Sequence, residues 1–235
     1  VDAGCKDHSV CPNAAEGIPM SDYIDPAKLD RLAEVAVRTG VNLQPGQDLV
    51  ITAPMAALDL VRRITVHAYK AGAGIVTPFF NDDAITLARY EHAPDESFDR
   101  APEWLFEGMA AAFKGGAARM AITGDDPMLL AEQDPKKVAR LSKATSIAAK
   151  PAMNPIVGFE VNWNIVAYPG AAWAAKVYPD LPVDEAQGKL MDAIYKASRL
   201  EGDDPVANWA NHTAELKKRV QWLNQQSFSA LKYTG

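Results

Sequence analysis

Short runs of apolar, β-branched residues alternate along the chain with longer segments in which apolar residues recur every three or four positions. The first pattern is typical of buried strands and the second of amphipathic helices. Strands are predicted at 48–53, 74–79, 118–123 and 163–168. Helices are predicted at 25–40, 56–71, 82–90, 102–114, 128–149 with a break near Asp134-Pro135, 170–177, 183–199 and 205–226.

This order of elements predicts the fold class. Strands separated by helices form βαβ units, whose parallel strands make one sheet with helices on both faces. We therefore expect an α/β fold followed by a mainly helical tail. In the last predicted helix, Trp209, Leu216, Val220 and Leu223 share one apolar stripe, and we expect that stripe to be buried.

Composition excludes several classes of protein. The 235 residues include 24 Lys and Arg against 30 Asp and Glu, which gives a net charge of −6. This acidic balance argues against a nucleic-acid partner, because phosphate binding needs clustered Lys and Arg. No run approaches the roughly 18 consecutive apolar residues that a membrane helix needs. We therefore expect a protein with neither a nucleic-acid nor a membrane partner.

The two cysteines, Cys5 and Cys11, both precede Met20. The body that starts at Met20 thus needs no oxidising compartment, which fits a cytoplasmic protein. Residues 1–19 lack apolar periodicity and the features of a secretory signal peptide, and we interpret them as a tag or a disordered leader. Cys5, His8 and Cys11 suggest a metal clip, but structural zinc takes four ligands in tight pairs, so incidental placement is favoured.

The body shows no complete catalytic constellation. It has no phosphate-binding loop, no G-x-S-x-G nucleophile elbow and no H-E-x-x-H zinc helix. His67, His92 and His212 lie in separate helical regions, without a second ligand one turn away. His67 lies on or beside an apolar helix face and is expected to be a packed or capping residue. His92 is expected to begin a loop.

Three acidic pairs each precede a predicted helix, where capping and the helix dipole explain them without catalysis. They are Asp82-Asp83, Asp125-Asp126 and Asp203-Asp204. Asp125-Asp126 also follows the third strand, and open parallel sheets bind ligands beyond the carboxyl ends of their strands. One hypothesis is therefore a stand-alone module that binds a small ligand around Asp125, Asp126 and Tyr168. Another is a purely structural or dimerisation domain.

The last seventy or so residues carry a dense set of matches to a known family. They are Tyr168-Pro169, Trp173-Ala174, Val177-Tyr178-Pro179-Asp180, Glu185-Ala186, Leu190, Ile194, Arg199, Asp204-Pro205, Trp209, His212, Leu216, Arg219, Leu223-Asn224, Phe228, Leu231, Tyr233 and Gly235. Thr39-Gly40-Val41, Leu43 and Pro45-Gly46 before the first strand also fit. From about Leu29 to its last residue the chain resembles the metallo-aminopeptidases that include aminopeptidase T, aminopeptidase S and leucine aminopeptidase II, also called the thermophilic metalloprotease family.

Two positions depart from the family pattern. Gly170 stands where threonine usually follows the Tyr-Pro pair, and Lys232 stands where histidine is common before the last tyrosine. Neither position is a metal ligand in the family pattern, so both leave the resemblance intact.

The resemblance implies that residues 20–235 form the flavodoxin-like amino-terminal domain of a two-domain, dimeric, metal-dependent aminopeptidase. The implied reaction removes the N-terminal amino acid from a peptide substrate. Two divalent ions (zinc, cobalt, manganese or magnesium) would activate water and polarise the scissile carbonyl. In the family the metal ligands lie downstream of the segment that ends here with Leu231–Gly235. This chain is therefore expected to hold no catalytic, cofactor-binding or metal-binding residue and to be inactive alone.

Overall fold

The computed structural model describes residues 24–234 and is built around one four-stranded sheet. Its strands are β1 (Leu49–Pro54), β2 (Val76–Asn81), β3 (Ala118–Thr123) and β4 (Trp163–Ala167). All neighbouring strands are parallel, in the order β2-β1-β3-β4. This order begins the flavodoxin-like arrangement, which reverses direction between β1 and β3. The predicted α/β class and parallel sheet are confirmed, with strand boundaries shifted by at most two residues.

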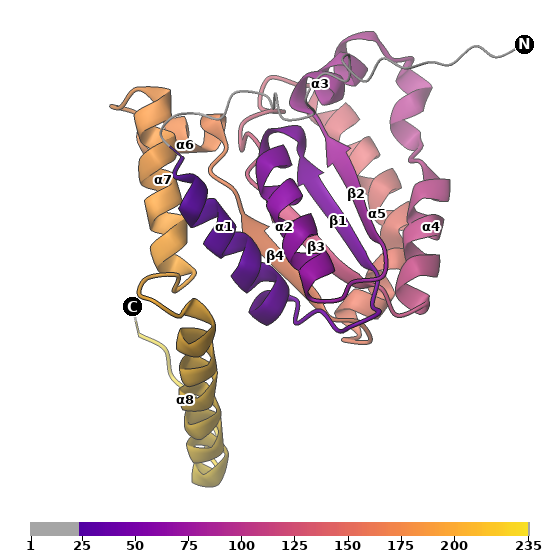
Figure 1. Ribbon diagram of the computed structural model, residues 1–235. Helices are drawn as coiled ribbons and strands as arrows, with labels where there is room; N and C mark the ends of the chain where they lie inside the picture. Colours follow the sequence, from indigo (N-terminus) through magenta and orange to yellow (C-terminus); the bar gives the residue numbers. More distant parts are fainter. Residues whose placement is uncertain (1–23, 235) are drawn as a thin grey trace, which may run out of the picture.

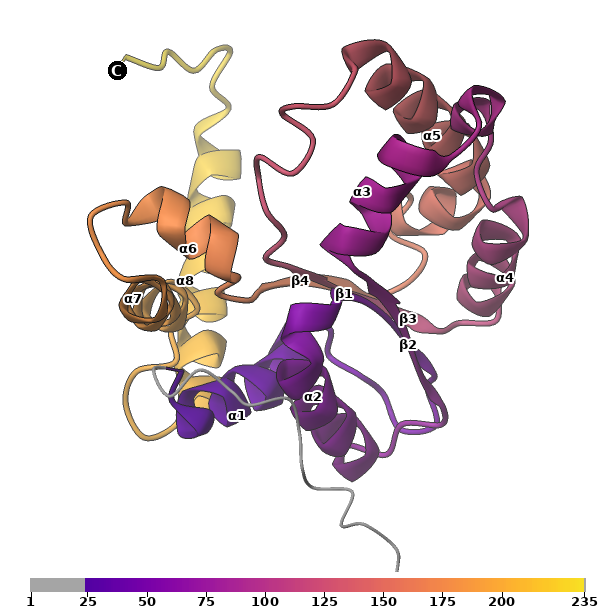
Figure 2. The same cartoon turned by 90° about the horizontal axis from the view of Figure 1, so that it is seen from above.

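Helices cover both faces of the sheet (Figure 1, Figure 2). One face is covered by α1 (Pro26–Val35) and α2 (Leu58–Lys70). The opposite face is covered by α3 (Asp83–His92), α4 (Glu103–Lys114) and α5 (Pro135–Val157). Beyond β4 follow α6 (Ala171–Val177), α7 (Val183–Ala197) and α8 (Pro205–Gln226). Short turns of other helix types occupy Ala36–Gly40, Met55–Ala57 and Asp95–Asp99.

Aspartate N-caps explain where four of the helices begin. The side chains of Asp25, Asp82, Asp134 and Asp204 each accept a hydrogen bond from a backbone N–H two or three residues later. Asp25, Asp134 and Asp204 are each followed by proline, whose fixed φ suits the first helical position.

Helix α5 differs from the predicted helix 128–149. The segment before Asp134 forms turns, because an Asp-Pro pair starts a helix rather than breaking one. The helix then continues to Val157 through two internal prolines, each of which removes a backbone hydrogen bond. Ala152 and Ile156 are buried in this part of the helix, and their packing offsets that loss.

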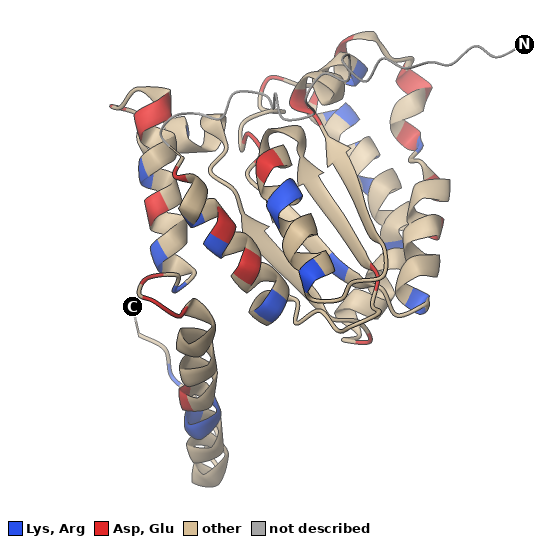
Figure 3. Ribbon diagram, in the orientation of Figure 1, with Lys and Arg blue, Asp and Glu red and all other residues tan. Residues whose placement is uncertain are grey.

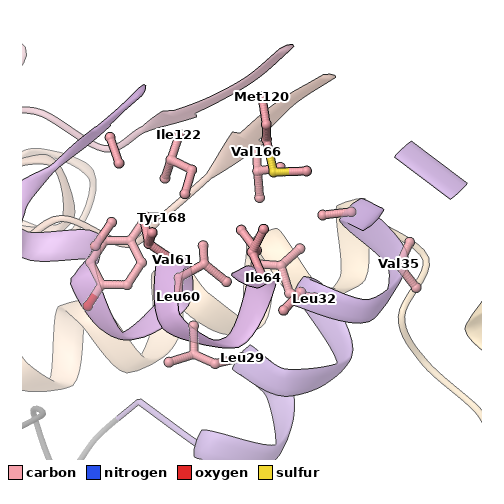
Figure 4. Close-up of a cluster of buried hydrophobic side chains, with 14 of the residues drawn as sticks. Leu29, Leu32, Val35, Leu60, Val61, Ile64, Met120, Ile122, Val166 and Tyr168 are labelled. Carbon is pink, nitrogen blue, oxygen red and sulfur yellow. The ribbon is translucent and has the colours of Figure 1, made fainter. Parts of the chain in front are cut away.

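The main core lies between the sheet and the pair α1 and α2 (Figure 4). Its central side chains are Leu29, Leu32, Val35, Leu60, Val61, Ile64, Met120, Ile122, Val166 and Tyr168. A smaller cluster on the opposite face joins Val50 and Phe113 to Ala152 and Ile156 of α5. The two clusters fix the sheet between its helical layers and hold the carboxyl ends of the strands in place.

Helix α8 has the predicted span, but the predicted burial of its apolar stripe is wrong. Leu216, Val220 and Leu223 are 44%, 54% and 43% exposed. Trp209 is half-buried against the main core, and its Nε1 donates to the Ser198 carbonyl at 2.8 Å. Figure 1 shows α8 projecting away from the sheet, so only its first turns reach the core. The helical spacing of the apolar residues predicts that they share one face of α8, but it does not show whether another element covers that face.

The described helices give no sign of a membrane-spanning segment. No described helix combines the length and the apolar character that crossing a membrane requires. Acidic and basic residues are interspersed along α1 and α7, whereas in α2 the acidic Asp59 of the first turn is followed by Arg62, Arg63 and Lys70 (Figure 3). The interpretation of residues 1–19, including Cys5, His8 and Cys11, lies outside the described residues.

Candidate functional site

The carboxyl ends of β2 and β3 bring polar side chains to one edge of the sheet. Asn81 ends β2, and Asp125 follows β3 after Gly124. Because β1 lies between these strands, the two residues reach across its carboxyl end. Asn81 Nδ2 donates a hydrogen bond to Asp125 Oδ1 at 2.8 Å. The strand order reverses beside β1, which is where open parallel sheets bind ligands.

Asp83 joins this edge from the first turn of α3. Its pKa is raised, chiefly because burial disfavours the charged carboxylate and also because Asp125 carries a like charge. Asp126 and Asp82 add repulsion, while a hydrogen bond to the Asp126 backbone opposes the shift. We call Asp82, Asp83, Asp125 and Asp126 the acidic edge. The hydrogen bond between Asn81 and Asp125 shows that chain segments distant in sequence meet there.

The acidic edge does not fit the metal pair that the resemblance implies. Asp82 accepts from the Ile85 N–H at 3.0 Å, and Asp126 accepts from the Met128 N–H at 2.8 Å. Asp82 therefore caps α3, whereas Asp126 closes a turn, because the expected helix after this pair begins only at Pro135. Across residues 24–234 no group of three or more His, Cys, Asp or Glu is arranged to hold a metal ion. A two-metal site about 3.5–4 Å across needs several converging ligands.

Tyr168 does not join the acidic edge. Its side chain lies in the main core, among the apolar side chains of α1 and α2 (Figure 4). Burial raises its pKa, and the charge of Asp59 adds to this effect. Its backbone pairs with the end of β3, where its N–H donates to the Thr123 carbonyl at 2.7 Å. The structure therefore does not form the hypothesised ligand site of Asp125, Asp126 and Tyr168.

The histidines of the body remain on three separate helices. His67 Nε2 lies 3.2 Å from Asp30 Oδ1 and links α2 to α1, in agreement with a packed or capping role. His92 is exposed and is the last residue of α3. The expectation that it begins a loop is wrong, because the helix extends slightly further than predicted. His212 meets the Trp209 ring edge-on, with centroids 5.8 Å apart.

Sequence reasoning missed Arg119. This half-buried residue lies in β3, with Val50 and Trp163 as its register partners on the neighbouring strands. Because successive side chains of a strand face opposite ways, Arg119 faces α4 and α5 while Ala118 and Met120 face the main core. The available signal was a single charge inside an otherwise apolar strand, a position that rarely holds an unpaired cation.

Comparison with known proteins identifies what the chain is similar to. Residues 25–235 match the profile of the family described as thermophilic metalloprotease (M29). Aminopeptidase T of Thermus thermophilus is 44% identical over 207 residues, which cover 88% of this chain and 51% of that protein. Aminopeptidase 2 of Geobacillus stearothermophilus is 38% identical over 206 residues, which cover 88% of this chain and 50% of that protein.

A solved structure agrees with these sequence matches. Wild-type AmpT from Thermus thermophilus matches with a TM-score of 0.83 and 42% identity, covering 89% of this chain and 51% of that chain. The similarity thus includes both the fold and the sequence. The chain spans about half the length of the curated relatives it matches.

Proposed function

Because the chain belongs to the thermophilic metalloprotease (M29) family, we propose that residues 20–235 form the amino-terminal α/β domain of a two-domain, metal-dependent aminopeptidase. The whole enzyme would remove N-terminal amino acids from peptides. The observation that carries this proposal is 44% identity to an aminopeptidase over 88% of the chain, with a matching fold.

The metal ligands of the whole enzyme are proposed to lie outside the described residues. The acidic edge and the separated histidines do not supply a metal pair, so the chain alone would be inactive. We propose that the whole enzyme holds two divalent metal ions, which are zinc, cobalt, manganese or magnesium. The proposed role of this domain is to pack against the metal domain and to form one wall of the peptide cleft.

Uncovered apolar side chains support a packing role for this domain. Leu216, Trp222 and Leu223 of α8 are 44%, 56% and 43% exposed, and Ile165 on the edge strand β4 is 54% exposed. Contiguous exposed apolar surface usually marks an interaction site. We propose that the rest of the enzyme covers α8.

We also propose that the enzyme is a cytoplasmic homodimer. The absence of cysteine after Met20 supports the location, because such a body gains nothing from an oxidising compartment. The resemblance to dimeric aminopeptidases supports the assembly. Sedimentation of the whole enzyme tests the dimer.

A chimeric enzyme tests the proposed function. The chain is fused to the carboxyl-terminal half of aminopeptidase T from Thermus thermophilus, at the point where the similarity ends. We expect the fusion to hydrolyse an amino-acid p-nitroanilide and to lose this activity with a chelator, while the chain alone shows none. Chelator-sensitive turnover by the chain alone, or a folded but inactive fusion, would contradict the proposal. A fusion with Leu216→Asp and Leu223→Asp is expected to lose activity if α8 packs on the metal domain.

A further inference from the structure

A pocket of about 270 Å³ lies between the sheet and helices α4 and α5. Most of its wall is apolar, and the main contributors are Phe79, Phe106, Met109, Phe113, Met153 and Ile156. The polar residues that line it are Thr52, Asn81 and Arg119. The pocket is separate from the main core, which lies on the other face of the sheet.

Arg119 brings an uncompensated charge to this pocket. Among residues 24–234 its guanidinium has no hydrogen-bond or ion-pair partner, and burial alone lowers its pKa, without any opposing effect from a nearby acid. Arg140, by contrast, forms ion pairs with Asp95 and Asp99. Burying a charge without a partner is costly, so the fold carries a penalty at Arg119 that an apolar residue would avoid.

The chemistry of the wall indicates what would remove that penalty. A guanidinium presents two parallel N–H groups that match the two oxygens of a carboxylate. The surrounding aromatic and methionine side chains make the wall mostly apolar, which favours an apolar body next to that carboxylate. A pocket of 270 Å³ falls just below the roughly 300–1,000 Å³ of drug-sized sites, so the ligand must be small.

We propose that this pocket binds a small apolar carboxylate, with its carboxylate on Arg119 and its apolar body between Phe79, Phe106 and Met109. Thr52 and Asn81 provide the remaining polar contacts at the wall. The ligand is either a free apolar amino acid or an acyl carboxylate, because both present the same anionic group on an apolar body. This inference does not depend on the proposed peptidase function.

Three ligands of one skeleton test the proposal on the 235-residue chain. They are L-phenylalanine, 3-phenylpropionate and the neutral 3-phenylpropanamide, titrated by calorimetry and by the NMR signals of the methionine methyl groups. We expect saturable binding of at least one carboxylate, shifts at Met109 and Met153, and roughly tenfold or more weaker binding of the amide. Tighter binding of phenylalanine identifies an amino-acid site, and tighter binding of phenylpropionate identifies an acyl site.

Two variants separate the charge from the fold. Arg119→Met keeps the length of the side chain and is expected to weaken carboxylate binding roughly tenfold or more, while amide binding stays unchanged. Arg62→Met removes an exposed arginine of α2, on the other face, and is expected to leave binding unchanged. No saturation by either carboxylate, or equal binding of carboxylate and amide, would overturn the proposal. The ligand comparison decides the matter even if Arg119→Met fails to fold.

Discussion

Gly170 and Gly124 bring the backbones that follow β4 and β3 into close contact. A Cβ added at Gly170 would overlap the carbonyl oxygen of Gly124, and one added at Gly124 would overlap that of Tyr168. The obstructing atoms belong to the backbone, so a small side-chain rotation cannot make room. Glycine at position 170, where the family resemblance leads one to expect threonine, is therefore matched to the local geometry of this chain.

Substitution of Gly170 tests this contact. We expect Gly170→Ala to lower the free energy of unfolding by about 1–3 kcal/mol, the usual cost of overpacking, and Gly170→Thr to cost at least as much. Gly108→Ala is the matched control, because Gly108 lies within α4 with open space around it. That change should stabilise by about 0.5–1 kcal/mol through helix propensity. Urea unfolding measures both, and similar effects of the two alanines would refute the contact.

Asp83 makes stability depend on pH. Its folded-state pKa is raised, first by burial and then by Asp125, so the folded protein binds this proton more tightly than the unfolded chain does. The ionised carboxylate therefore destabilises the fold above its folded-state pKa, and the effect is relieved as the pH falls through that pKa. Asp83→Asn is expected to raise the free energy of unfolding at pH 7 by less than about 1 kcal/mol, since the site is partly exposed.

The pH series provides the check on Asp83. At about pH 3, below the ordinary aspartate value, Asp83 is neutral in both states, and the gain from asparagine should vanish. Asp134→Asn replaces an N-cap aspartate of α5 that lies outside the acidic edge, and asparagine caps equally well. It should show no gain at pH 7. An advantage of Asp83→Asn that persists at pH 3 would point to a cause other than charge.

At the scale of elements, local chemistry determined what could be predicted. Caps such as Asp25 and Asp204 act within a few residues, so the starts of α1 and α8 follow from the sequence. The far end of α5 depends on burial of Ala152 and Ile156 against other elements, which no local pattern contains. The contact between Asn81 and Asp125 likewise depends on the strand order β2-β1-β3, which places the ends of β2 and β3 on either side of β1. The order of the strands along the chain does not determine their order in the sheet.

Two tryptophans of α8 test how far this helix is attached to the body. Trp209 is half-buried and donates to the Ser198 carbonyl, whereas Trp222 is 56% exposed. We expect Trp209→Ala to cost about 2–3 kcal/mol, less than the roughly 3–5 kcal/mol of a fully buried aromatic. Trp222→Ala should stay within about 0.5 kcal/mol. Far-UV circular dichroism during urea unfolding measures both without relying on tryptophan emission, and equal costs would show that α8 attaches differently.

At the scale of the whole molecule, the sheet separates two kinds of surface. One face buries the main core against α1 and α2, which explains the stability of the fold but offers no chemistry. The other face and the carboxyl ends hold Arg119 and the acidic edge. Helix α8, which carries the exposed stripe, projects away from the sheet (Figure 1). The proposed ligand pocket and the proposed packing surface therefore lie in different parts of the molecule, so substitutions can test them independently.

The last prediction concerns metal uptake by the chain without its first nineteen residues. Starting at Met20 removes Cys5, His8 and Cys11, which could scavenge zinc weakly. After dialysis against zinc, cobalt or manganese, elemental analysis is expected to find far less than one ion per chain. The physical reason is ligand supply: Asp82 and Asp126 already accept hydrogen bonds from backbone N–H groups, and Asp125 accepts one from Asn81.

A positive result would have a definite meaning. One tightly held ion per chain that disappears in Asp125→Asn or Asp83→Asn would establish a metal site at the acidic edge and overturn the assignment of all metal ligands to the rest of the enzyme. The aminopeptidase fusion provides the opposite control, because it should retain metal through dialysis. Metal in the fusion but not in the chain would locate the ligands in the other half, where a pair of ions requires several converging carboxylates and histidines.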